Sequence, residues 1–313
     1  VYASFALVFA AHSFGREEVL FGSGGEVREG EGPLGFLRGI WPAGSEGDCP
    51  RPVPTLIFVA LLGVLFFYAS IRLQVALGEA GILATQLGFI LVPALLFVFV
   101  GGYRASATLS LRAPGLRNLL AAVLIIGGGT PLVWFLTWVQ GFFLPMPQEF
   151  LEGMSDLLSA NSPSRILWLL LLVAITPAVC EEVLFRGVLL SGLRGKLPFL
   201  STVVVSGLIF GAFHVPGATV VRFLPSAVLG MLLAWVVFRS RSIWAGMLMH
   251  FINNGSIVVL SAFPWILERF SDPGQGPPLW LLAPAVASIL AGGFLLETTG
   301  SRGNRIQGEE RTG

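Results

Sequence analysis

Charged residues are scarce in this 313-residue chain, at 12% against the roughly 25% of a soluble globular domain. Apolar residues make up 54% of the chain, which excludes a disordered or collagen-like protein. With 19 basic and 18 acidic residues the net charge is +1, so we expect no nucleic-acid partner. Cysteine is also rare: Cys49 lies in an expected loop and Cys180 in an apolar run. The sequence therefore predicts no structural disulfide.

The sequence contains several long runs of apolar residues. A helix needs about 20 apolar residues to cross the roughly 30 Å of hydrocarbon in a bilayer. Eight runs approach that length: 55–77, 81–100, 118–140, 165–190, 199–214, 221–238, 243–262 and 279–297. The sequence therefore predicts an all-α fold, a polytopic transmembrane helical bundle of about eight helices.

The connections between these runs differ in arginine content, which predicts their orientation because cytoplasmic loops are enriched in Lys and Arg. Alternate connections collect most of the basic residues on one side: Arg104, Arg112, Arg117, Arg194, Lys196, Arg239, Arg241, Arg302, Arg305 and Arg311. The other side receives Arg165, Arg222 and Arg269, with the acidic Glu149, Glu152 and Asp156. We expect a multi-pass protein of a prokaryotic cytoplasmic membrane, with both termini cytoplasmic.

Of the acidic residues only Glu181 and Glu182 lie well inside a predicted span, and of the three histidines two, His214 and His250, are intramembrane. A charge at the bilayer centre costs about 2.5 to 3.5 kcal/mol on insertion scales, so such residues usually have a function. They lie on three separate predicted helices, which makes these helices the candidate site.

Helical spacing assigns these residues different neighbours. Glu182 and Arg186 are four residues apart and should pair on one face, whereas Glu181 lies about 100° around the helix and is free to face something else. Pro177 removes a helical hydrogen bond close to the pair and should open the helix there. Gly207 and Gly211 form a stripe of small residues that predicts close packing against a neighbouring helix, and Gly246, His250 and Asn254 align on one stripe that offers a polar face.

Two chemistries fit a carboxylate that converges with imidazoles in a dry cavity. The carboxylate and one imidazole can deprotonate a water, while a second His and an amide donate to the oxyanion formed on a peptide carbonyl. Alternatively, Glu181, His214 and His250 could ligate a divalent metal such as zinc, with water as the fourth ligand. The spacing does not separate these versions, and the short His-Glu-x-x-His zinc signature is absent.

Three motifs in this order resemble those of a known family. Glu181-Glu182-Val-Leu-Phe-Arg186, Phe210-Gly-Ala-Phe-His214 and His250-Phe-Ile-Asn-Asn254 resemble the EExxxR, FxxxH and HxxxN motifs of the CAAX prenyl protease type 2 and bacteriocin-processing (CPBP) intramembrane endopeptidases. The resemblance implies that Glu181 and His214 activate the water and that His250 and Asn254 form the oxyanion hole. Glu182, Arg186 and Phe210 would support them. It also implies a membrane-embedded or lipidated polypeptide substrate, prenylated or bacteriocin-like.

The resemblance suggests a division of the chain. We expect the end of an upstream membrane helix and a cytoplasmic linker over 1–54, accessory transmembrane helices over 55–114, and the CPBP-like protease core over 115–265. A final transmembrane helix over 266–297 and a cytoplasmic tail over 298–313 would follow. The segment Val1 to Phe21 resembles the end of an ABC exporter permease, which would make exporter components partners. Its letters Arg16-Glu17-Glu18-Val-Leu-Phe-Gly22 repeat the first motif without its arginine and are discounted.

Two other functions remain open from the sequence. A transporter or ABC exporter subunit could use the same residues to relay protons, although no internal repeat indicates one, and an immunity protein could keep the fold without proteolysis. Proteolysis requires Glu181, His214 and His250 to converge within a few ångströms. The predicted boundaries oppose this, since they place Glu181 and His250 about 10 to 14 Å deep and His214 about 22 Å deep.

Overall fold

The computed structural model describes residues 49–160, 162–215, 220–263 and 276–309, with only the backbone from 299 onward. The predicted upstream helix end, almost all of the linker, the repeated motif letters at Arg16 to Gly22 and the last four residues of the tail lie outside the described residues. In the described part both cysteines are free, as predicted.

Helices and turns make up the described residues, without a β-strand, which confirms the all-α prediction. The N-terminal helices are α4 (Pro52–Leu77), α5 (Glu79–Ala84), the π-helical η1 (Thr85–Leu91), α6 (Val92–Val100), the short α7 (Ala105–Thr108), α8 (Leu116–Gly141) and α9 (Gln148–Leu158). The next five elements form one continuous rod: α10 (Pro163–Leu169), η2 (Leu170–Ile175), α11 (Thr176–Glu182), η3 (Val183–Leu189) and α12 (Leu190–Leu193). The remaining elements are α13 (Phe199–Phe213), the 3-10 turn η4 (Val220–Arg222), α14 (Phe223–Ser240), α15 (Ile243–Ser261), the 3-10 turn η5 (Leu279–Leu281) and α17 (Leu282–Glu309).

Seven segments in the described part are long and apolar enough to cross a membrane: Pro52–Leu77, Glu79–Val100, Leu116–Gly141, Pro163–Leu193, Val220–Ser240, Ile243–Ser261 and Leu279–Thr298. The protein is therefore a multi-pass membrane protein. The predicted span 199–214 is the exception, because α13 has 15 residues and is about 22 Å long by helical rise. It begins after Pro198 and ends where His214 caps it. Helix α13 is too short to cross the bilayer alone.

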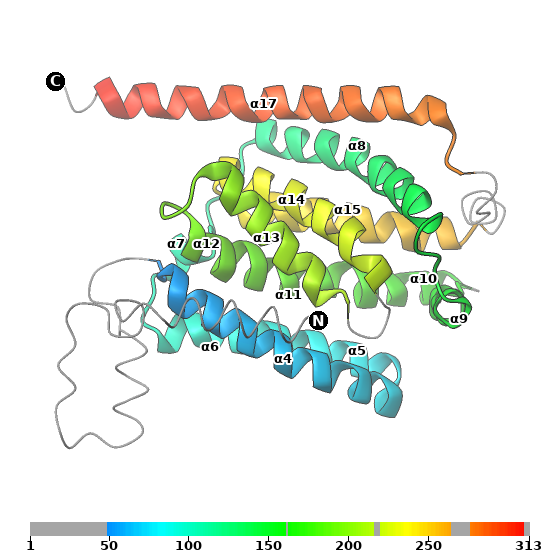
Figure 1. Cartoon of the computed structure of the whole chain (residues 1–313). Coiled ribbons are helices and arrows are strands. Elements are labelled where there is room, and N and C mark those ends of the chain that lie inside the picture. Colours follow the sequence, from blue (N-terminus) through cyan, green and yellow to red (C-terminus); the bar gives the residue numbers. More distant parts are fainter. Residues whose placement is uncertain (1–48, 161, 216–219, 264–275, 310–313) are drawn as a thin grey trace, which may run out of the picture. The chain divides into compact units, whose positions relative to one another are not determined.

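Helix α8 occupies the middle of one half of the bundle (Figure 1). It packs against α17 on one side and against α14 and α15 on the other. The buried contacts there come from Ile125 and Ile126 of α8, Leu233 of α14 and Met249 of α15. Large apolar side chains are exposed on the outward faces of α4 and α17, for example Leu61 and Phe294, which suits helices that face lipid.

Helices α13 and α14 form a tightly packed hairpin beside the rod. A Cβ on Gly207 would lie 2.7 Å from the carbonyl oxygen of Ala227, and one on Gly211 would lie 2.6 Å from that of Phe223. The predicted glycine stripe is thus the face on which α14 approaches, and larger residues there would force the two helices apart.

Candidate active site

The rod from Pro163 to Leu193 carries the first motif and is distorted around it. Pro177 has no N–H and cannot donate to the carbonyl oxygen of Val173, four residues earlier. The side-chain amide nitrogen of Asn254, on α15, donates to that oxygen at 2.9 Å. The wide π-helical turns η2 and η3 lie on either side of α11. Such turns often mark functional sites, and here they flank Glu181 and Glu182.

The sequence predicted different depths for Glu181 and His214, which argued against a common site. The observed end of the rod makes this difference smaller. The rod continues to Leu193, three residues beyond the predicted 190, so Glu181 lies about 18 Å from its end by helical rise. His214, at the far end of α13, lies about 22 Å from Phe199 by the same measure. The two side chains can therefore meet without a break in either helix.

Glu181 lies where three elements converge. Its Oε2 is 3.9 Å from Nε2 of His214 and 3.9 Å from Nε2 of His250. Its other oxygen, Oε1, accepts a hydrogen bond of 2.7 Å from Nε2 of Gln86 in η1. The structure thus brings together three of the residues that the motifs singled out. The site is more open at His214, whose side chain is 18% exposed, than at His250, which is 2% exposed.

The opposite nitrogen of each imidazole is already bonded, which assigns its tautomer from the hydrogen-bond network. Nδ1 of His214 donates to the carbonyl oxygen of Phe210 at 2.9 Å, and Nδ1 of His250 donates to Oε1 of Glu182 at 2.9 Å. In the neutral imidazoles both Nε2 atoms then carry lone pairs. Three acceptors, Oε2 and two Nε2 atoms, therefore face one another, an arrangement that suits a water, which can donate two hydrogen bonds.

Glu182, Arg186 and Phe210 surround this cluster as buried support. Nη1 of Arg186 is 3.0 Å from Oε1 of Glu182, which is the predicted pair, and Nη2 donates to the carbonyl oxygen of Gly230 at 3.1 Å. The guanidinium carbon lies 4.4 Å from the ring centre of Phe210. That ring is 4.6 Å from His214 and 5.9 Å from His250. Phe210 therefore packs against the buried arginine and against both imidazoles, which helps to fix their positions.

Asn254 is held by bonds that the sequence did not predict. Besides its donation to Val173, its Oδ1 accepts a 3.0 Å hydrogen bond from Nδ2 of Asn253. Oδ1 of Asn253 in turn accepts one of 3.1 Å from Thr130 in α8. This chain of amides ties α15 to the rod and to α8. A primary amide has two N–H groups, so one of them remains available to an oxyanion.

Two residues near the cluster were missed by the sequence reasoning. Gln86 is buried, and its signal was an isolated amide inside the apolar run 81–100, where a side-chain amide needs a partner on another helix. Arg222, at the start of the hairpin's second helix, lies close enough to interact electrostatically with Glu181 and His214. The sequence had placed it in a connection between spans.

The donor atoms of the cluster are of the kind that zinc binds, but they are not arranged as a metal site. One carboxylate and two imidazoles are ligands that zinc accepts, and Oε2 of Glu181 is buried without a hydrogen-bond partner in the described part. Among the residues that the structure describes, however, no group of three or more His, Cys, Asp or Glu side chains is arranged to hold a metal ion. The mechanism below therefore takes no step through a metal.

Fold and site together define a polytopic membrane protein with a carboxylate and two imidazoles converging inside its helical bundle. Residues 163–256 match the family model described as type II CAAX prenyl endopeptidase Rce1-like, and this match, which includes all three motifs, confirms the family that they resembled. The matched family is one of membrane proteases, and the matched segment lies inside the predicted core 115–265. Comparison with curated proteins and with solved structures gives no match.

Gly246 allows α15 to reach the buried carboxylate, and its replacement should loosen the site. A Cβ there would lie 2.7 Å from Oε2 of Glu182 and 2.7 Å from Val237. We expect Gly246→Ala to destabilise the protein by about 1–3 kcal/mol, as overpacking does, measured as a lower midpoint of thermal unfolding in detergent. The control is Gly255→Ala on the same helix, whose Cβ would have ordinary contacts from 3.6 Å. Equal midpoints for the two variants would contradict this account.

Proposed function

We propose that the chain is an intramembrane endopeptidase that hydrolyses a peptide bond in a membrane-associated polypeptide. The observation that carries the proposal is the approach of Glu181 Oε2 to within 3.9 Å of Nε2 of both His214 and His250. A buried carboxylate that faces the unprotonated Nε2 of His214 is arranged to hold a water and to take its proton. The family match supports the same class of reaction.

The attack begins at this water. Glu181 accepts one water proton while Nε2 of His214 accepts a hydrogen bond from the other O–H and orients the oxygen. The oxygen bonds to the carbonyl carbon of the scissile peptide, and the C=O electron pair moves onto the carbonyl oxygen. When the C–N bond breaks, the leaving nitrogen takes the proton back from Glu181. The balance is one water consumed and one peptide bond cleaved.

The oxyanion is stabilised by His250 and Asn254. His250 donates from Nε2 as the imidazolium, which takes its second proton from solvent before the substrate binds, and the carboxylate of Glu182, 2.9 Å from Nδ1, stabilises that charge. Asn254 contributes the N–H that is not bonded to Val173. Removing one donor of this kind costs about 10²–10³ in kcat in a hydrolase.

The substrate is a membrane-embedded or lipidated polypeptide, because the cluster lies among the membrane-spanning helices, and the family resemblance adds that it is prenylated or bacteriocin-like. We place the protein in the cytoplasmic membrane of a prokaryote on the arginine content of its loops. Both termini lie in the cytoplasm because the hairpin of α13 and α14 enters the membrane and returns to the side on which the rod ends. Components of an ABC exporter are proposed as partners on the resemblance of the first 21 residues.

Replacement of Glu181 by Gln should abolish proteolysis, because glutamine keeps the size of the side chain but cannot accept the water proton. We expect product formation to fall at least about 100-fold, the usual lower bound for loss of a general base. The measurement compares N termini of membrane proteins by mass spectrometry in cells that express the chain or the variant at equal abundance. Glu297→Gln serves as the control, since that carboxylate pairs with Arg239 and lies outside the cluster. New termini that persist in Glu181→Gln would contradict the assignment.

Gln86 should act as a positioning residue for Glu181. In Gln86→Leu the carboxylate loses the 2.7 Å donor to Oε1, and a lost hydrogen bond to a charged group is worth about 1.5–3 kcal/mol. We therefore expect kcat to fall about 10- to 100-fold with KM nearly unchanged, measured on a substrate identified from the new termini. The control is Gln74→Leu, an exposed amide in α4. A change confined to KM, or one equal in both variants, would remove Gln86 from this role.

Removal of divalent metal should leave the activity intact. Treatment of the purified protein with 1,10-phenanthroline tests this directly, because the proposed mechanism draws its base and its oxyanion donors from side chains alone. Activity that disappears with the chelator and returns with added zinc would instead assign Glu181, His214 and His250 as ligands.

A further inference from the structure

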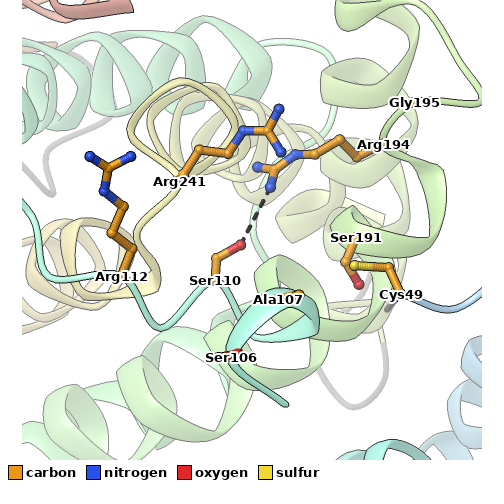
Figure 2. A pocket seen from close by; sticks show the side chains of 9 residues that line it. All are labelled: Cys49, Ser106, Ala107, Ser110, Arg112, Ser191, Arg194, Gly195 and Arg241. Atoms are coloured by element: carbon orange, nitrogen blue, oxygen red, sulfur yellow. Dashed lines mark hydrogen bonds between the residues drawn. The ribbon is translucent and has the colours of Figure 1, made fainter. Parts of the chain in front are cut away.

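A basic pocket shares no residue with the Glu181 cluster, and Figure 2 shows the side chains that line it. It encloses about 400 Å³ between the segment that precedes α8, the end of the rod, and the turn from α14 to α15. The residues that line it are Cys49, Ser106, Ala107, Ser110, Arg112, Ser191, Arg194, Gly195 and Arg241. Three of these are arginines, three are serines and none is acidic. We call this cavity the arginine pocket.

Arg194 is the fixed member of the pocket. It donates from Nη1 to the hydroxyl of Ser110 at 3.4 Å and from Nη2 to the carbonyl oxygen of Val237 at 3.1 Å, which leaves Nε buried without a partner in the described part of the chain. Burial, together with the charge of Arg241, lowers the pKa of Arg194 to about 10. The positive charges in this pocket therefore repel each other.

Arg112 and Arg241 complete the charge from the pocket's open side. Both are exposed, and within the described residues neither side chain has a hydrogen bond or an ion pair. Three guanidinium groups around one cavity form a strong site for an anion, and planar guanidinium groups match the oxygens of a phosphate group especially well.

The backbone at two walls of the pocket is held in an unfavourable conformation. Ser110 has φ 53° and Arg241 has φ 56°, and they are the two non-glycine residues with positive φ in the described part. The amide of Ile243 donates to the carbonyl oxygen of Ser110 at 2.9 Å and joins the two segments. Arg241 is the left-handed residue that ends α14, whereas strain like that at Ser110 persists where the surroundings impose it and is concentrated at functional sites.

The pocket lies at the ends of membrane-spanning helices, where lipid headgroups lie. The spans ending at Leu193 and Ser240 and the span beginning at Ile243 all meet it. Beside Arg112, the side chain of Leu111 is exposed, and Trp244 is exposed while its indole nitrogen donates to the carbonyl oxygen of Leu111 at 3.4 Å. Tryptophan is enriched at the membrane interface. The ligand that fits has an anionic head for the arginines and apolar tails beside these residues.

We propose that the arginine pocket binds the phosphate-bearing headgroup of an anionic membrane lipid. Basic pockets between helices on the positively charged side of a membrane protein are the usual form of such sites. The assignment is independent of the proposed proteolysis, because it uses none of the residues of the Glu181 cluster.

The test titrates the full chain in detergent with three probes: phosphatidylglycerol, phosphatidylcholine with the same acyl chains, and inorganic phosphate. Native mass spectrometry measures bound lipid, and thermal unfolding measures the effect of phosphate. We expect phosphatidylglycerol to bind at least about tenfold more tightly than phosphatidylcholine, and inorganic phosphate to have no effect at the same concentration. In the double variant Arg112→Gln with Arg241→Gln this preference should disappear.

Arg104→Gln is the matched control, since Arg104 is exposed in the same segment and does not line the pocket. It should keep the tenfold preference. The midpoint of unfolding without lipid should be the same in the double variant and the control, which would show that the loss is not a folding defect. A preference that survives the double variant, or is lost equally in the control, overturns the site. Stabilisation by inorganic phosphate as strong as that by the lipid overturns the lipid assignment in favour of a soluble anion.

Discussion

One buried carboxylate oxygen, Oε1 of Glu182, holds the centre of this membrane bundle together. It is 3.0 Å from the guanidinium of Arg186 and 2.9 Å from the imidazole of His250. Glu182 and Arg186 are fully buried, so breaking this set would leave a charge without its partner, which is strongly destabilising. Through His250 the interaction fixes α15 against the rod, and through the bond from Arg186 to Gly230 it fixes the hairpin of α13 and α14. The site can form because these three parts are locked together here.

The same interaction explains why two adjacent carboxylates can have different tasks. Glu182 has its Oε1 bonded to a cation and an imidazole, which leaves it little freedom to react. Glu181, about 100° around the helix, is bonded through one oxygen to Gln86 and presents the other to two imidazole nitrogens. The position of Glu182 on the helix therefore suits a structural role, and Glu181 is the carboxylate that remains available for the proposed chemistry. The proposed activity therefore depends on Glu182 through His250, whose Nδ1 it holds.

The features that the sequence predicted correctly are those set by the geometry of a single helix. The pair of Glu182 and Arg186 is set by the four-residue repeat of a helix, and the glycine stripe of α13 by the same repeat, so both could be derived from spacing alone. Gln86 donates to a residue 95 positions away, and Asn254 finds its acceptor at Val173 only because Pro177 frees that carbonyl. These contacts depend on how the helices pack, which spacing does not encode. The depth of His214 was obscured for a related reason, since hydropathy does not show that the rod extends to Leu193.

The arginine pocket lies at one end of the rod, at a definite distance from Glu181. Alternation of spans predicted that Arg112, Arg194 and Arg241 lie at the same end of the bundle, but their union in one cavity requires the left-handed backbone at Ser110 and Arg241, which no residue pattern signals there. Arg194 directly follows the rod that carries Glu181. A headgroup held at Arg194 would fix the end of that rod at the membrane surface, and Glu181 would then lie about 18 Å below it by helical rise. In the proposed protease a substrate presents its scissile bond at that depth, so lipid binding at one end of the rod would bear on which polypeptides the cluster can reach.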